Sequence, residues 1–190
     1  MAKVKLNPIL EQIRGQVGDL VFKRYGDEVV ITRKPDMSNI VPSPAQLAHR
    51  ERFRQATVYG KLVLADPDAK AFYEQAADAK GTPVLALTVA DFFNAPSVDE
   101  IDLSSYHGQA GDPISVLAHD DFQVQQVQVE LSNGAGNTLE SGLAVQTPPA
   151  SGRWLYTASS EVAPGETVRI AVTAVDRPGG TDMESAEKII

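Results

Sequence analysis

Residues 20–34 form two short runs of branched and aromatic side chains separated by Gly-Asp. This pattern is typical of a β-hairpin, and glycine at the first loop position suits a type II′ turn. The register set by that turn pairs Phe22 with Ile31 and Arg24 with Val29. The sequence therefore predicts a two-stranded ribbon at the start of the chain.

The predicted hairpin is apolar on both faces, which is unusual for a ribbon on its own. One face carries Leu20, Phe22, Val29 and Ile31, and the other carries Val21, Tyr25 and Val30. An isolated hairpin is marginally stable in water, and bare strand edges are usually covered. A strand from a neighbouring chain would complete the sheet. The alternative is cover from within the chain, by residues 4–16 or by the C-terminal part.

Three segments with helical periodicity follow a proline-rich linker, and we predict helices over 44–64, 67–79 and 83–94. Each begins with a residue that can cap a helix followed by proline: Ser43-Pro44, Asp66-Pro67 and Thr82-Pro83. Gly81 is a suitable end for the second helix. The apolar positions expected to cover one face of the hairpin are Leu47, Phe53, Ala56, Tyr59, Val63, Ala69, Phe72, Tyr73, Ala76, Leu85, Val89 and Phe92.

After Pro96 the pattern changes to short alternating runs separated by turn residues. The runs are 101–103, 114–118, 124–131, 138–145, 154–158, 167–175 and 183–190. About seven short strands of this kind predict an antiparallel, immunoglobulin-like β-sandwich, with Trp154 inside it. The predicted fold class is therefore α+β. A hairpin with about three helices forms the module 1–96, and an Ig-like sandwich forms the module 97–190.

Two stretches carry a resemblance to known proteins. "VQVELSNGAGNTLESGLA" and "PGETVRIAVTAVDRPGG" resemble bacterial Ig-like and fibronectin-like modules, over roughly residues 99–190. "IRGQVGDLVFKRYGDEVVITRKP" followed by "SPAQLAHRERFRQA" is similar to uncharacterised bacterial and prophage-associated proteins. Those proteins have a GKVG start, a hairpin and a P-x-Q-x-x-x-R-x-x-F helix. Gln16 replaces the lysine of that start, and the resemblance implies no catalytic residue.

Charge is divided unevenly along the 190 residues, whose net charge is −8. Residues 1–61 hold 11 Lys/Arg and 6 Asp/Glu, a balance of +5, and residues 62–190 have a balance of −13. Such polarity favours head-to-tail attraction between copies, although two separately evolved modules would also produce it. No signal peptide is recognised at the N-terminus. We expect synthesis in the cytoplasm and a final location outside the cell or in a virion-like assembly.

The sequence offers little for catalysis. There is no cysteine, and GxSxG, HExxH and phosphate-loop patterns are absent. His119-Asp120-Asp121 has the composition of a metal or acid–base cluster, but we favour a polar turn between strands. Loop aspartates at the sandwich ends could bind Ca²⁺, although no EF-hand spacing supports this: Asp112, Asp120, Asp121, Asp176 and Asp182. We therefore predict no enzyme activity, metal or cofactor.

The sequence leaves three function classes: a structural subunit, an enzyme, and a nucleic-acid or ligand-binding module. We favour a structural subunit that self-assembles into a filament or virion-like particle and displays its Ig-like domain. The partner is a further copy of the chain, and no membrane span is predicted. The predicted assembly interface is Leu6, Ile9, Leu10, Val21, Tyr25 and Val30. A monomeric module that binds a protein or glycan is the alternative. A nucleic-acid-associated role is disfavoured; its basic face would be Lys23, Arg24, Arg33, Lys34, Arg50 and Arg54.

Overall fold

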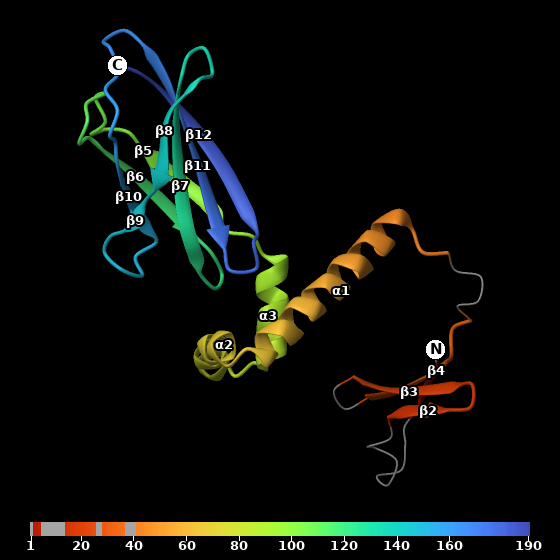
Figure 1. Cartoon of the computed structure of the whole chain (residues 1–190). Coiled ribbons are helices and arrows are strands. Elements are labelled where there is room, and N and C mark those ends of the chain that lie inside the picture. The colour runs from red at the N-terminus through yellow and green to blue at the C-terminus, as the bar shows by residue number, and fades with distance from the viewer. Residues whose placement is uncertain (1, 5–13, 26–27, 37–40) are drawn as a thin grey trace. The chain divides into compact units, whose positions relative to one another are not determined.

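A computed structural model describes residues 2–4, 14–25, 28–36 and 41–190. The chain divides into two compact units, Met1–Leu47 and Ala48–Ile190 (Figure 1). This division falls near the start of the first helix and differs from the predicted boundary at residue 96.

The first unit contains a four-stranded antiparallel sheet. Its strands are β1 (Ala2–Val4), β2 (Gly15–Val17), β3 (Leu20–Tyr25) and β4 (Glu28–Arg33), in the order β1-β4-β3-β2. The predicted register of the hairpin is confirmed, because Phe22 pairs with Ile31 and Arg24 with Val29. The prediction that another subunit covers the hairpin edges was wrong, and the alternative of cover from within the chain holds for these edges. β1 pairs along β4 and β2 pairs along β3, so both edges of the hairpin are completed within the chain.

Burial in this sheet is concentrated on β4. Val29 and Val30 are only 6% and 8% exposed, although they point to opposite faces of the sheet. Val30 was expected to become buried only in an assembly, and the single chain already buries it. Tyr25 remains exposed and Val21 half-buried. The other predicted interface residues, Leu6, Ile9 and Leu10, lie outside the described residues, as does the Gly26-Asp27 turn.

Three helices follow, close to their predicted limits: α1 (Pro44–Ala65), α2 (Pro67–Lys80) and α3 (Val84–Phe93). Ser43 and Gln46 form the predicted capping box at the start of α1, each accepting a hydrogen bond from the other's backbone N–H. The Asp66 carboxylate caps α2, and Gly81 ends it in the left-handed conformation. The third start differs: the cap position of α3 is Pro83, and no side chain caps it.

The buried face of α3 is not the one expected from its apolar spacing. Leu87, Thr88 and Asp91 are buried, whereas Leu85 is exposed. Thr88 faces Gly60 of α1, where an added Cβ would lie 2.6 Å from the Thr88 Oγ1. The missing side chain at Gly60 therefore permits a close crossing of α1 and α3.

Eight strands form the predicted sandwich: β5 (Ser97–Asp102), β6 (Pro113–His119), β7 (Val124–Asn133), β8 (Thr138–Leu143), β9 (Val145–Gln146), β10 (Arg153–Thr157), β11 (Thr167–Asp176) and β12 (Thr181–Ile189). The sheets have the orders β5-β6-β10-β9 and β12-β11-β7-β8. In chain order these are the ABED and GFCC′ arrangements of immunoglobulin-like sandwiches. The predicted fold class is confirmed. The run 138–145 divides at buried Ala144, so that β8 and β9 join different sheets.

Alternation along the strands produces the sandwich core. In β11, Val168, Ile170, Val172 and Ala174 are fully buried, and their neighbours are more exposed. Trp154 is 7% exposed and belongs to this core, as predicted. The sandwich therefore buries apolar side chains from both of its sheets without disulfides.

Helix α2 packs against the sandwich within the second unit. The Tyr73 ring stacks on Phe122 with centroids 4.6 Å apart, and Phe72 meets the same ring edge-on at 5.4 Å. Phe122 lies between β6 and β7, so α2 contacts a loop of the sandwich. In the described part of the chain, no helix combines the length and apolarity needed to cross a membrane.

Candidate functional site

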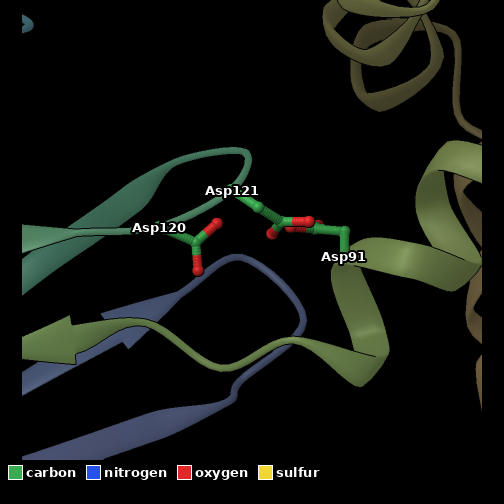
Figure 2. Close-up of side chains that lie close together, drawn as sticks. All are labelled: Asp91, Asp120 and Asp121. Atoms are coloured by element: carbon green, nitrogen blue, oxygen red, sulfur yellow. The ribbon is translucent and has the colours of Figure 1, made fainter.

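Three aspartates from distant parts of the second unit converge where the helices meet the loop between β6 and β7. Asp91 lies on α3, and Asp120 and Asp121 lie in the loop between β6 and β7. One carboxylate oxygen from each residue lies within 4.8 Å of the others. Figure 2 shows the Asp91 and Asp121 carboxylates directed toward one another, with Asp120 beside them. We call these three residues the carboxylate cluster.

Asp91 is held in the interior by the helices. It is 1% exposed, and its Oδ2 accepts a hydrogen bond of 2.5 Å from the Tyr73 hydroxyl. The Tyr73 hydroxyl lies 2.8 Å from that of Tyr59 on α1. The Asp91 Oδ1 is buried and has no hydrogen-bond partner among the described residues. One oxygen of this carboxylate is therefore fixed and the other is left unsatisfied.

The two loop aspartates have different surroundings. Asp120 Oδ1 accepts hydrogen bonds from the backbone N–H groups of Phe122 and Gln123, at 2.7 and 3.0 Å. Its Oδ2 is buried and, within the described ranges, unpartnered. Asp121 is exposed, and its Oδ2 accepts a hydrogen bond of 2.8 Å from the Asn94 side chain just after α3. The loop geometry thus fixes both carboxylates relative to the end of α3.

A fourth acidic residue, Asp176, lies at the end of β11 and is 2% exposed. Its Oδ1 accepts hydrogen bonds from the backbone N–H groups of Gly179 and Gly180. A Cβ at Gly180 would lie 2.5 Å from Asp176 Oδ2, so glycine is needed for this close approach. That Oδ2 is also buried without a hydrogen-bond partner in the described structure.

Burial and mutual repulsion raise the pKa values of these carboxyl groups. The pKa of Asp91 rises to about 7, chiefly because burial disfavours its charged form. The negative charges of Asp120, Asp176 and Asp121 also raise it, while the bond from Tyr73 opposes the rise. The pKa values of Asp120 and Asp176 are raised by burial, and each is raised further by nearby carboxylates. Burial and the neighbouring carboxylates therefore both disfavour the charged forms of these groups.

Two of the five predicted loop aspartates belong to the cluster, and Asp176 is electrostatically coupled to it. Asp112 lies at the opposite end of β6, where it accepts hydrogen bonds from His107 and Gln109 backbone N–H groups. Asp182 accepts one from the Val98 N–H instead. These two residues therefore serve local structure.

His119 does not join the neighbouring Asp120 and Asp121 in a shared site, and the favoured interpretation of this stretch was a polar turn between strands. His119 Nδ1 lies 2.5 Å from the Asp99 carboxylate on β5, outside the carboxylate cluster. The missed member is Asp91. Its only signal in the sequence was a charged residue within the otherwise apolar segment "VLALTVADFF".

The predicted basic residues are exposed, but they are divided between the two units. Lys23, Arg24, Arg33 and Lys34 lie on the first unit, and Arg50 and Arg54 on the second. Arg54 makes two hydrogen bonds to the Glu51 carboxylate, at 2.6 and 2.9 Å. The Glu51 interaction indicates that Arg54 helps to stabilise the surface of α1.

A groove adjoins the cluster on its sandwich side. Its volume is about 910 Å³, and its lining includes Phe72 and Ala76 of α2, Phe122, and the turn at Pro149 and Gly152. Asp120 is the lining residue that it shares with the cluster. The groove is open and mostly bordered by apolar and small side chains.

Comparisons with known proteins supply little beyond this geometry. No family model matches the chain, and no curated protein matches it. A solved structure titled as a bromine derivative of BhCBM56 is similar over 51% of this chain and 91% of its own, with 13% identity and a TM-score of 0.31. An engineered protein from a structural genomics consortium is similar over 56% of this chain and 26% of its own, with 18% identity and a TM-score of 0.32.

Proposed function

We propose that the protein is a non-enzymatic structural subunit that associates with further copies of itself through its N-terminal region and displays its Ig-like sandwich. The observation that carries this proposal is apolar surface left exposed on the first unit. Val17 of β2 and Leu20 of β3 pair across the sheet and thus share a face, and they are 69% and 44% exposed. Apolar side chains grouped in this way favour association.

Helix α1 also leaves apolar side chains exposed. Its buried residues are Ala56, Gly60 and Val63, whereas the larger Leu47, Phe53, Val58 and Leu62 are exposed. A 22-residue helix with so few buried positions has apolar area available for a partner. The proposed interface therefore lies on β2 and β3 and no longer depends on Val30, and α1 is a separate apolar surface that a partner could cover.

The uneven charge along the sequence supports another copy of this chain as the partner. Residues 1–61 have a balance of +5 and residues 62–190 a balance of −13. Opposite potentials favour contact between the N-terminal region of one copy and the acidic C-terminal part of the next. A head-to-tail contact of this kind continues into a filament unless its rotation closes a ring. We propose a filament or virion-like assembly on this basis.

The experiment compares the purified protein with a Leu20→Ser variant by multi-angle light scattering and negative-stain microscopy. We expect polymers or rings of the parent protein, and monomers of the variant at the same concentration. Leu20 is exposed, so the substitution removes association surface with little effect on folding. Raising the salt concentration should also weaken assembly of the parent, because salt screens exposed charges.

Leu143→Ser is the matched control, because Leu143 is an exposed leucine on β8 of the sandwich. This control should assemble like the parent. Assembly of Leu20→Ser at parental levels would overturn the proposed interface. A parent that stays monomeric at high concentration would overturn self-assembly itself.

A monomeric binding module is the second candidate, and the groove beside α2 favours it. The groove combines Phe72 and Phe122 rings with polar Gln75, Gln123 and Gln146 side chains, a mixture common in ligand sites. A Gln75→Ala, Gln123→Ala double variant should then lose binding to a protein or glycan ligand that the parent captures from an array. Equal capture by both proteins would exclude this groove as the binding site.

A further inference from the structure

We propose that Asp91, Asp120 and Asp121 bind a divalent cation, Ca²⁺, which links α3 to the β6–β7 loop of the sandwich. This inference is independent of self-assembly, because none of these aspartates belongs to the proposed assembly surface.

The spacing of the carboxylates suits Ca²⁺. Ca²⁺ lies about 2.4 Å from its oxygen ligands, so two ligands on opposite sides of the ion are roughly 4.8 Å apart. The three candidate oxygens all lie within 4.8 Å of one another. One ion can therefore contact all three carboxylates, and water can supply the remaining ligands at the exposed Asp121 side.

The hydrogen bonding leaves ligand atoms available. Asp91 Oδ1 and Asp120 Oδ2 are both buried and lack partners among the described residues, while their second oxygens are fixed by Tyr73 and by backbone N–H groups. Burying an unsatisfied carboxylate oxygen is costly, and a cation removes that cost. This arrangement orients one free oxygen from each of these two side chains.

The cations near the cluster bind other groups, and the Arg177 guanidinium lies 4.3 Å from the centre of the Phe72 ring. In the part of the chain that the structure describes, no lysine or arginine forms an ion pair with these three aspartates. Lys80 donates to the backbone carbonyl of Asp121 and not to its carboxylate. A bound divalent ion would offset two of the clustered negative charges.

Asp176 is a further buried carboxylate close to the cluster, and its burial is independent of the spacing of the three cluster oxygens. It comes from a third segment, is 2% exposed, and keeps one buried oxygen without a partner. Its charge acts on both Asp91 and Asp120. Two buried acidic residues, Asp91 of α3 and Asp176 at the end of β11, thus lie close to Asp120 and the exposed Asp121, and a buried carboxylate normally needs a compensating partner.

The donor set favours Ca²⁺ over transition metals. All candidate ligands are carboxylate oxygens, which suit hard cations, and the nearby His119 is directed to Asp99. Mg²⁺ needs shorter distances of about 2.1 Å and stricter octahedral geometry, so we expect it to bind more weakly.

The test titrates CaCl₂ into metal-stripped full-length protein by isothermal titration calorimetry and follows thermal unfolding in CaCl₂ and in EDTA. We expect one ion per chain. We also expect a melting temperature higher by on the order of 5 °C when free Ca²⁺ exceeds the dissociation constant about 100-fold. The same titration with MgCl₂ should show weaker binding. Absence of Ca²⁺ binding by the parent protein would overturn the proposal.

Three variants locate the site. Asp91→Asn should abolish Ca²⁺ binding, and in EDTA it should melt at or above the parental temperature because it removes a buried charge. Asp121→Asn, at an exposed position, should weaken Ca²⁺ binding at least 10-fold without a large change of fold. Asp78→Asn removes an equal charge from the exposed surface of α2 and should bind like the parent. Parental affinity in both Asp91→Asn and Asp121→Asn would place any bound Ca²⁺ elsewhere.

Discussion

The sandwich and the N-terminal sheet are both antiparallel and both disulfide-free, yet they bury their side chains very differently. The sandwich core draws fully buried residues from both of its sheets, including Ile114, Val129 and Ile170. In the described part of the N-terminal sheet, burial is concentrated at Val29 and Val30 of β4. Two facing sheets can form a core between them, whereas a single four-stranded sheet has no second layer of its own. From this difference we expect the sandwich to depend most on its buried side chains, and we assign association to the N-terminal region.

The largest effect is expected from Trp154→Ala in the sandwich. Removing a buried aromatic side chain should lower the free energy of unfolding by about 3–5 kcal/mol. Calorimetry or urea denaturation followed by circular dichroism measures this loss. If the variant unfolded like the parent, the stability of the sandwich would not depend on its buried core, and the contrast with the N-terminal sheet would fail.

An intermediate effect is expected from Val30→Ala in the N-terminal sheet. The lost methyl groups and the resulting cavity should cost roughly 2 kcal/mol of local stability. Hydrogen exchange should increase in residues 14–36 and stay unchanged in residues 97–190, because Val30 belongs to the other compact unit. Val29→Ala probes the opposite face of the same strand in the same way. Equal acceleration in the sandwich would show that the two regions unfold together.

The smallest effect on stability is expected from Tyr25→Ser. Tyr25 is 63% exposed, and surface substitutions usually change stability by less than about 0.5 kcal/mol. Its melting temperature should match that of the parent. Tyr25 lies on the face opposite Val17 and Leu20, so this variant should lose less assembly than Leu20→Ser. The comparison between regions would be sharpened if Leu20→Ser lost assembly while Tyr25→Ser and Leu143→Ser, on the sandwich, retained it.

Local patterns predicted much of the fold. The hairpin register followed from its turn, the Ser43 and Asp66 caps followed from capping chemistry, and alternation gave most sandwich strands. The flanking strands β1 and β2 were missed, because three-residue strands have too few positions to show a period. β1 and β2 form only by pairing with the hairpin, and a local sequence pattern does not predict such pairing.

Two of the three residues of the carboxylate cluster could be recognised from the sequence. Asp120 and Asp121 were recognised as loop aspartates, since a turn signal surrounds them. Asp91 was not, because a single acidic residue on a helix is usually solvated and its burial depends on how α3 meets α1 and the sandwich. Its distance of 29 positions from Asp120 in the sequence hides a proximity that only tertiary structure creates.

The position of the only tryptophan has a spectroscopic consequence. Trp154 lies in the sandwich core, so its fluorescence emission reports on the sandwich and not on the N-terminal sheet. Tyrosines are present in both units, at Tyr25 and at several positions after residue 48. Excitation at wavelengths too long for tyrosine to absorb therefore selects Trp154 and reports on the second unit of the intact chain without a label. A Tyr25→Trp substitution would add a second reporter, in the first unit.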